Sequence, residues 1–406
     1  MVKRKLFALL QAVALATLLL SCSNSRVSKN YDISKISDSV IKANSEFAFN
    51  VFKKLNDEDV SENIFISPIS ISTALTMTYN GAESGTKLAM ENALGFTNLD
   101  RGLVNESYKN LIGHLENLDK KIDLSIGNSI WIRENQNINE EFKANNKTFF
   151  NAEVSALDFS DPSSAGTIND WIKDTTKGKI EKMVDSPIDP DVIMYLINAI
   201  YFKGQWREQF DPKQTSDAVF YIQDGSLQNV KMMNRQDTVE YGKGDGYKAV
   251  RLPYGSNKTS MTIILPDEGI DINNYIKDLD MEKWVSIRDS IKEVDDVQLS
   301  IPKFKLEYGI KNLNNSLKAL GMEEAFSEKA DFSGIRPEIF ISRVLHKAVI
   351  EVNEEGSEAA GATVVEIRET AAPTERITFI ADRPFVFFIT DDTTNTLLFM
   401  GKVSSI

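Results

Sequence analysis

Cysteine and histidine are scarce in this chain of 406 residues, which contains one cysteine and two histidines. Because a disulfide needs two cysteines, no bridge can form within the chain. The sequence also lacks the G-x-S-x-G, H-E-x-x-H and P-loop motifs of common hydrolases, zinc proteases and nucleotide enzymes. The cysteine lies close to the N-terminus, which excludes a Cys–His catalytic pair from the rest of the chain. These absences argue against an enzyme, and we predict neither a metal nor a cofactor.

Acidic residues outnumber basic ones. The chain has 46 Lys and Arg and 59 Asp and Glu, which gives a formal net charge of -13. Nucleic-acid binding needs a basic surface, so we predict no nucleic-acid partner. An acidic surface is compatible with cationic protein partners, which it would attract. The many acids leave a carboxylate-pair enzyme open, but no particular pair stands out.

The N-terminus reads as an export signal. A basic KRK stretch precedes an apolar run, residues 6–20, which is too short to predict a spanning helix. The LLSC sequence ending at Cys22 resembles a bacterial lipobox, in which the cysteine receives lipid after cleavage; a plain secretory signal is the alternative. We predict a lipoprotein signal peptide over residues 1–21 and a flexible tether over 22–38. Since Ser23 is not the aspartate of inner-membrane retention, we expect an anchor in the outer membrane, with the periplasmic or cell-surface face left open.

The rest of the chain alternates helical and strand patterns without a repeat or a composition break. Apolar spacing predicts a helix from about residue 39, and Ser67 is placed to cap a helix that begins at Pro68. A near-continuous apolar run over 194–202 predicts a fully buried strand. The later half is richer in strand patterns. These features predict one α+β domain over residues 39–406.

Five stretches in this domain, taken in order, resemble motifs of the serpin family of serine protease inhibitors. They are NIFISPISI (63–71), LINAIYFKGQW (196–206), VLHKAVIEVNEEG (344–356), ADRPFVFFI (381–389) and LLFMGKV (397–403). The resemblance extends from about residue 39 to the end of the chain, and the five motifs in matching order are far more specific than any one motif alone.

The resemblance implies the serpin fold, with three β-sheets, eight or nine helices and an exposed reactive-centre loop at about residues 356–380. It also implies a mechanism. A target serine protease attacks the loop and forms an acyl-enzyme, and the cut loop then inserts into the main sheet before the protease can deacylate. The expected partners are serine proteases, host proteases among them, bound covalently by a monomeric inhibitor.

The sequence itself shows whether the loop could insert into a sheet as a strand. The relevant segment is EEGSEAAGATVVEIRETAAP, residues 354–373. Taken alternately from Ser357, one face carries no charge and grows from small to bulky residues, whereas the other face carries every charge. This pattern predicts a half-buried strand, while a flexible linker would explain only the first half. The hinge residues implied by the family are Glu354, Gly356, Ser357, Ala359, Ala360 and Gly361.

The family spacing from the hinge glycine places the attacked bond at Thr370–Ala371. The neighbouring bonds Arg368–Glu369, Glu369–Thr370 and Ala371–Ala372 remain alternatives. Small residues at this point suit an elastase-like protease, whereas Arg368 would suit a trypsin-like one. A loop with several usable bonds could inhibit several proteases.

The resemblance also implies two groups of supporting residues. The shutter consists of buried polar groups that exchange partners as the main sheet opens, namely Ser67, Ser70, Asn198 and His346. The breach, where insertion begins, includes Trp206 and Lys303, with Lys303 paired to Glu354. Such a histidine is equally well explained as a satisfied core residue.

The alternative prediction is a protein that has the serpin fold but does not inhibit proteases. In this case the protein would be a non-inhibitory serpin-fold binding protein, such as a carrier or an adhesin. The small, uncharged inward face of the hinge favours inhibition over this alternative.

Overall fold

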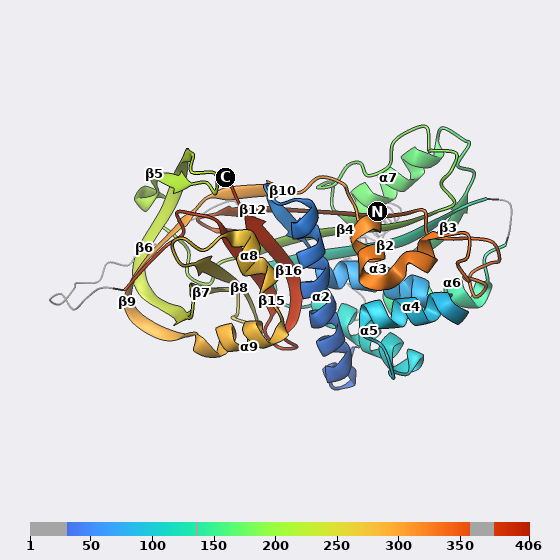
Figure 1. Ribbon diagram of the computed structural model, residues 1–406, viewed down its shortest axis with the longest axis horizontal. Coiled ribbons are helices and arrows are strands. Elements are labelled where there is room, and N and C mark those ends of the chain that lie inside the picture. Colours follow the sequence, from blue (N-terminus) through green and yellow to red (C-terminus); the bar gives the residue numbers. More distant parts are fainter. Residues whose placement is uncertain (1–30, 135–136, 358–376) are drawn as a thin grey trace, which may run out of the picture. The chain divides into compact units, whose positions relative to one another are not determined.

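The computed structural model describes residues 31–134, 137–357 and 377–406. One compact unit extends from Asp32 to Ile406 (Figure 1). The predicted signal peptide and Cys22 lie outside the described residues, so export, lipidation and the outer-membrane location stay predictions. Among the described helices, none is both long enough and apolar enough to cross a membrane.

The folded unit begins inside the segment that the sequence predicted as a tether. A 3₁₀ turn, η1 (Ile33–Lys35), is held at both ends. The Asp32 backbone N–H donates to Asn110 Oδ1 at 2.7 Å, and the Ser37 N–H donates to Ser107 Oγ at 2.8 Å. The prediction of a tether is therefore wrong for its last seven residues, because they belong to the compact unit and two of their backbone N–H groups donate to side chains of the domain.

Nine α-helices lie within the described part of the chain. The sequence placed the first of them within a residue of its start. They are α2 (Asp38–Glu58), α3 (Pro68–Tyr79), α4 (Ser84–Leu94), α5 (Arg101–Leu115), α6 (Glu140–Phe150), α7 (Ser164–Thr175), α8 (Ile272–Lys277), α9 (Met281–Ser290) and α10 (Asn314–Leu317). Three shorter helical segments are the 3₁₀ turns η2 (Pro212–Gln214) and η4 (Glu323–Phe326) and the π-helical η3 (Lys318–Met322).

The main sheet has seven described strands in the order β10–β12–β13–β4–β2–β3, with β11 also paired to β12. Its strands are β2 (Ile122–Arg133), β3 (Glu153–Leu157), β4 (Met194–Gln205), β10 (Phe304–Glu307), β11 (Lys311–Asn312), β12 (Arg343–Asn353) and β13 (Gly356–Ser357). Strand β4 is buried along almost its whole length, as its apolar run predicted.

A second sheet has nine described strands in the order β1–β16–β15–β8–β7–β6–β9–β14, with β5 also paired to β6. Its strands are β1 (Ile64–Ile66), β5 (Ser216–Tyr221), β6 (Leu227–Gly244), β7 (Tyr247–Tyr254), β8 (Thr259–Pro266), β9 (Lys292–Pro302), β14 (Thr378–Ile380), β15 (Phe385–Asp391) and β16 (Thr396–Val403).

The family resemblance implied three sheets, and β6 explains why backbone pairing joins two of them. This strand pairs with β5 at its beginning and with β7 at its end, while β9 runs along its other edge. Because one continuous strand takes part in both regions, the second and third expected sheets form a single hydrogen-bonded network.

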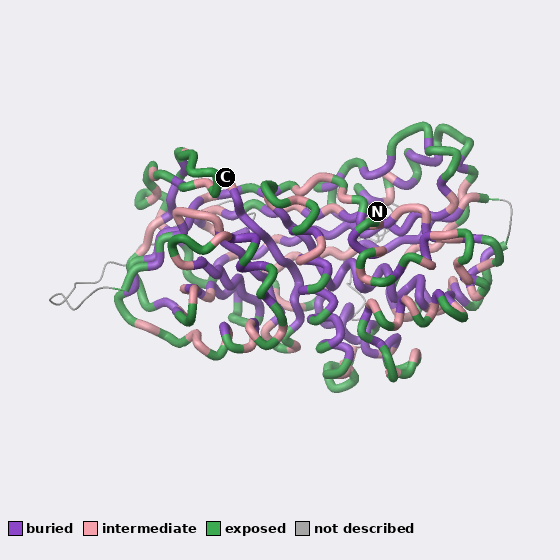
Figure 2. The backbone as a smooth tube through the Cα atoms, viewed as in Figure 1, coloured by how far each residue is buried: buried purple, intermediate pink, exposed green. Residues whose placement is uncertain are grey.

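The core lies between the two sheets and the helices packed on them (Figure 2). Every residue of α3 is buried, and so is every residue of β15 and β16. Phe65 stacks between Phe387 and Phe399, with ring centroids 5.8 and 5.2 Å apart. A separate apolar cluster lies under α7, where Trp131 of β2 meets Trp171 edge-on at 6.1 Å. The main sheet is therefore packed on both faces.

Candidate functional site

A slot in the main sheet is the most unusual feature of the backbone. Strands β4 and β12 pair in parallel over seven residue pairs, from Tyr195–Arg343 to Tyr201–Val349. Beyond that point the two strands separate, and β13 lies between them, antiparallel to both. The sheet thus already contains the first two residues of a strand that could continue between β4 and β12.

Strand β13 is held by a buried hydroxyl pair. Ser357 is fully buried, and its Oγ lies 2.7 Å from the hydroxyl of Tyr254. Burial raises the pKa of Tyr254 more than this hydrogen bond lowers it, so the phenol stays protonated. Gly356 passes so close to β4 that a Cβ there would lie 2.0 Å from the Gly204 carbonyl oxygen. A residue with a side chain therefore cannot replace Gly356 without moving the backbone.

Trp206 connects this pair to the chain that leads into it. Its ring stacks on Tyr254 with a centroid distance of 4.4 Å. Its indole N–H donates to the Asn353 carbonyl at 3.0 Å, and its backbone N–H donates to the Glu355 carbonyl at 2.9 Å. One tryptophan thus contacts the end of β12, the turn after it and the residue that holds β13.

Glu354 and Lys303 form the ion pair that the sequence predicted, with Nζ and Oε2 2.8 Å apart. Thr215 Oγ1 also donates to Glu354 Oε1 at 2.8 Å. Burial raises the pKa of Glu354, but the bonds from Lys303 and Thr215 outweigh this effect, so the pKa lies below its usual value. Because the Lys303 side chain is 39% exposed, the pair adds little to stability and serves mainly to orient the turn.

The four predicted shutter residues lie together beneath the β4–β12 pair. The Asn198 amide donates to Ser70 Oγ and, at 2.8 Å, to Asn128 Oδ1. Asn198 Oδ1 lies 2.7 Å from His346 Nδ1, and the Ser67 backbone N–H donates to His346 Nε2 at 3.1 Å. Each buried polar group in this cluster therefore has a partner.

These contacts fix the protonation state of His346. Since Nε2 accepts a hydrogen bond, Nδ1 carries the proton and donates it to Asn198. Burial lowers the pKa of His346 to about 3, so the ring is neutral at pH 7. A neutral ring with both nitrogens occupied is suited to holding strands together and not to acting as a catalytic base.

Part of the predicted reactive loop belongs to strands at its two ends. The sequence treated Gly356 as the start of the free loop, but Gly356 and Ser357 are paired in β13. At the other end β14 pairs in parallel with β9. The loop prediction of 356–380 is therefore too long, because backbone pairing at both ends was not visible in the sequence. Outside the described residues lie Ala359, Ala360, Gly361, Arg368, Glu369, Thr370, Ala371 and Ala372.

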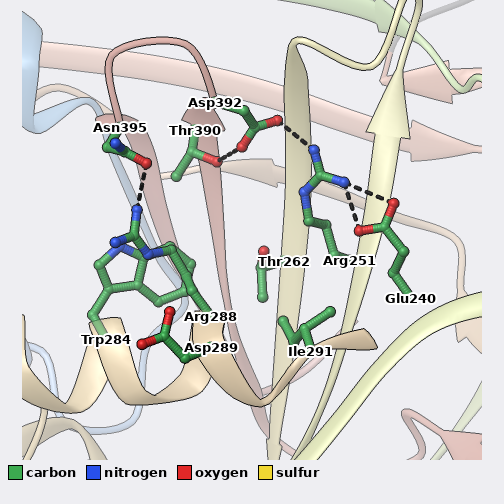
Figure 3. A pocket seen from close by; sticks show the side chains of 10 residues that line it. All are labelled: Glu240, Arg251, Thr262, Trp284, Arg288, Asp289, Ile291, Thr390, Asp392 and Asn395. Atoms are coloured by element: carbon green, nitrogen blue, oxygen red, sulfur yellow. Dashed lines mark hydrogen bonds and ion pairs between the residues drawn. The ribbon is translucent and has the colours of Figure 1, made fainter. Parts of the chain in front are cut away.

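A hollow of about 330 Å³ lies away from the slot, between α9 and the second sheet (Figure 3). Arg251 bridges its rim, bonding Glu240 at 2.6 Å and Asp392 at 2.7 Å. Arg288 bonds Asn395 on the other side. These charged groups pair with one another, and no metal-binding cluster occurs among the described residues, so the slot remains the candidate site.

Comparison with known proteins agrees with this geometry. The family model described as "Serpin (serine protease inhibitor)" matches residues 42–406. The chain belongs to the serpin family.

Curated relatives of this serpin match it over nearly its whole length. Human Serpin B8 is 37% identical, covering 91% of this chain and 100% of the relative, and a leukocyte elastase inhibitor from Bos taurus is 35% identical, covering 89% and 98%. The native crystal structure of the thermophilic serpin Tengpin is 35% identical with a TM-score of 0.83, covering 93% of this chain and 96% of the other. The fold is therefore that of the serpins.

Three contributors to the serpin slot were missed by the sequence analysis. Asn128 could have been found, since it is a polar residue within the apolar strand run LSIGNSIW. Tyr254 and Thr215 gave no local signal. Both reach residues of the slot that are more than 100 positions away along the chain, which no short motif reveals.

The neutral state of His346 predicts a pH dependence of stability. The unfolded chain binds a proton at His346 below its ordinary pKa of about 6.5, whereas the folded protein does not until about pH 3. Stability from this residue is therefore complete above pH 6.5 and falls by about 1.4 kcal/mol per unit as the pH decreases below it. Urea midpoints measured at pH 7 and pH 5 should fall further for the natural protein than for His346→Gln, whose amide can replace both bonds. Equal decreases in the two proteins would contradict the neutral assignment.

Proposed function

We propose that this serpin inhibits serine proteases as a suicide substrate. The single observation that carries the proposal is β13, which occupies the slot between β4 and β12 in the register of a new strand. A chain that starts inside the slot needs only to continue along it once it is cut. The family match and the relative named as an elastase inhibitor support the same function.

The observed register predicts where each loop residue would lie after cleavage. Gly356 pairs with Gln205 and Ser357 with Gly204, so residues 358–367 would continue opposite residues 203–194 of β4. The charged face found in the sequence would then turn toward α7, and the uncharged face toward the core. The strand ends where β4 ends at Met194, only a few residues before the predicted bond.

The same register supports a role for the shutter residues. Thr363 would lie opposite Asn198 on β4 and opposite His346 on β12. Between Ser357 and Ile367 it is the only core-facing residue besides Ser357 that has a side-chain hydrogen-bonding group. Its hydroxyl would enter the polar cluster of Asn198 and His346, so these groups could change partners when β4 and β12 separate, without being left unsatisfied.

The chemistry requires only the target protease and the loop. The protease serine oxygen attacks the carbonyl carbon of Thr370, the bond to Ala371 breaks, and the new amine takes the proton that the protease's base removed from the serine. An ester then joins Thr370 to the protease. Residues 358–370 span about 43 Å when extended at roughly 3.3 Å per residue, so insertion of the first ten would carry that ester past the end of β4.

An elastase-like protease is the proposed target class. The Thr-Ala-Ala sequence around the bond offers only small side chains to a specificity pocket. The name of the bovine relative is consistent with this class. Cleavage at Arg368 by a trypsin-like protease would shorten the inserted strand by two residues, which makes it the weaker choice.

Covalent trapping is tested by mixing the protein with elastase-, trypsin-, chymotrypsin- and subtilisin-like proteases. We expect a complex that survives a denaturing gel, most abundantly with the elastase-like enzyme. Mass spectrometry of the released C-terminal peptide identifies the cut bond. Clean loop cleavage with full protease activity in every case would favour the non-inhibitory binding protein instead.

Thermal stability should increase when the loop is cut and inserts. A ten-residue strand adds two rows of backbone hydrogen bonds and buries one apolar face. We expect a clear increase in the midpoint, since an unfolding entropy of about 2.1 cal/mol/K per residue makes each kcal/mol of added stability worth roughly 1.3 °C in a unit of this length. The measurement compares intact and loop-cleaved protein by calorimetry, and an identical midpoint would argue against insertion.

Ser357→Arg should convert the inhibitor into a substrate. The arginine would place an unpaired charge in a fully buried position beside Tyr254, which costs several kcal/mol. We expect cleavage by the target protease without a stable complex. Ser357→Thr, which keeps the hydroxyl, is the matched control and should still form the complex. Normal inhibition by the arginine variant would refute the assignment of the slot.

A further inference from the structure

A short segment of chain crosses the turn between β12 and β13 and holds it in place. This hinge strap, residues 206–215, leads from the end of β4 to the start of β5. Besides the bonds already described, its Phe210 N–H donates to the Glu354 carbonyl at 2.9 Å, and its Gln209 amide donates to the Glu355 carbonyl at 3.4 Å. Because β13 begins directly after this turn, the hinge strap fixes the point from which an inserted strand would extend.

Arg235 of β6 holds the middle of the hinge strap. Its guanidinium lies over the Phe210 ring, with Cζ 4.9 Å from the ring centroid, and its Nη1 donates to the Glu208 carbonyl at 2.6 Å. The preceding residue, Asn234, donates from its amide to the Gln214 carbonyl at 2.9 Å, near the end of the strap. Two neighbouring residues of the second sheet therefore keep the hinge strap in place.

Arg235 also stands in a row of residues that reaches the other end of the reactive loop. It is directly opposite Leu299 of β9, and Leu299 is directly opposite Phe379 of β14. Leu299 and Phe379 are fully buried, and residues of one row point to the same face of a sheet, so Arg235 occupies an inward position. Since β14 belongs to the C-terminal end of the predicted loop, this row connects the hinge strap to the chain on the far side of the loop.

An arginine is a costly residue for this inward position. Burial lowers the pKa of Arg235, and its Nε has no hydrogen-bond partner among the described residues. An unsatisfied buried donor destabilises a fold, whereas an apolar side chain of similar volume in place of a buried charge is often neutral or stabilising. The contacts that Arg235 makes with the hinge strap therefore explain it better than a contribution to the free energy of unfolding.

We infer that Arg235 is a positioning residue for strand insertion, acting through the hinge strap on the seated residues of β13. The inference rests on the proposed inhibitory function. Insertion competes with hydrolysis of the ester, because a slow start gives water time to release the protease. While Arg235 holds the strap, the turn and Gly356 stay in register with β4, and the cut loop extends from a fixed base. Without this hold the base of the strand loosens, and more protease escapes.

Arg235→Met tests this role, because methionine keeps an apolar side chain and loses both contacts of the guanidinium. Denaturing gels with an elastase-like protease measure the ratio of complex to cleaved protein. One ordinary hydrogen bond corresponds to about a fivefold change in a rate, so we expect this ratio to fall about fivefold. Calorimetry of the intact variant should give an unfolding midpoint that is unchanged or higher. A normal ratio, or a ratio that falls together with the midpoint, would overturn the inference.

Arg207→Met is the matched control, because it makes the same substitution within the hinge strap. Arg207 is exposed, and its guanidinium pairs at the surface with the Glu208 carboxylate at 3.7 Å. This control should leave the ratio unchanged, and a loss equal to that of Arg235→Met would contradict the assignment.

Arg235→Lys keeps a cation and a donor at the same position. It should retain more of the natural ratio than Arg235→Met, and a ratio as low as that of the methionine variant would refute the role of the charge. If the natural protein forms no complex with any protease, the proposed function itself fails, and this outcome is distinct from the failures of the inference.

Discussion

The parallel pairing of β4 with β12 is the contact on which the rest of the structure depends. Both strands pair antiparallel with their outer neighbours, β2 and β10, and only the contact between them is parallel. Parallel pairing is slightly less stable per residue than antiparallel pairing. A strand running opposite to both would replace one parallel interface with two antiparallel ones, and β13 already runs in that direction.

The polar cluster beneath this pair makes the contact separable. With an entirely apolar centre, the side chains would add only packing to the backbone pairing of β4 with β12. Asn198 and His346 bond each other, and Asn198 also bonds side chains from α3 and β2. The cluster therefore links β4 to β12, to the neighbouring strand and to the helix packed on the sheet. Because all the groups are paired, the cluster stabilises the present arrangement while offering hydrogen bonds to a new partner.

The resemblance of the sequence motifs to the serpin family implied the fold and the slot residues. Ser67, Ser70, Asn198 and His346 could be assigned in this way, and all four meet. Partners that come from another sheet, such as Tyr254, could not be assigned, because their contact depends on the packing of distant segments. The residues before α2 were misjudged for a related reason. Their polar composition is that of a linker, and only the side chains of α5 show where their hydrogen bonds go.

The stacking of Trp206 on Tyr254 gives the molecule an internal optical reporter. The chain has four tryptophans, and this indole contacts the very phenol that holds Ser357. It is also bonded to the carbonyl of Asn353 at the end of β12. Any movement of β13 or of the adjoining turn therefore changes the polarity and packing around one fluorophore, so the state of the slot can be followed in real time without attaching a dye.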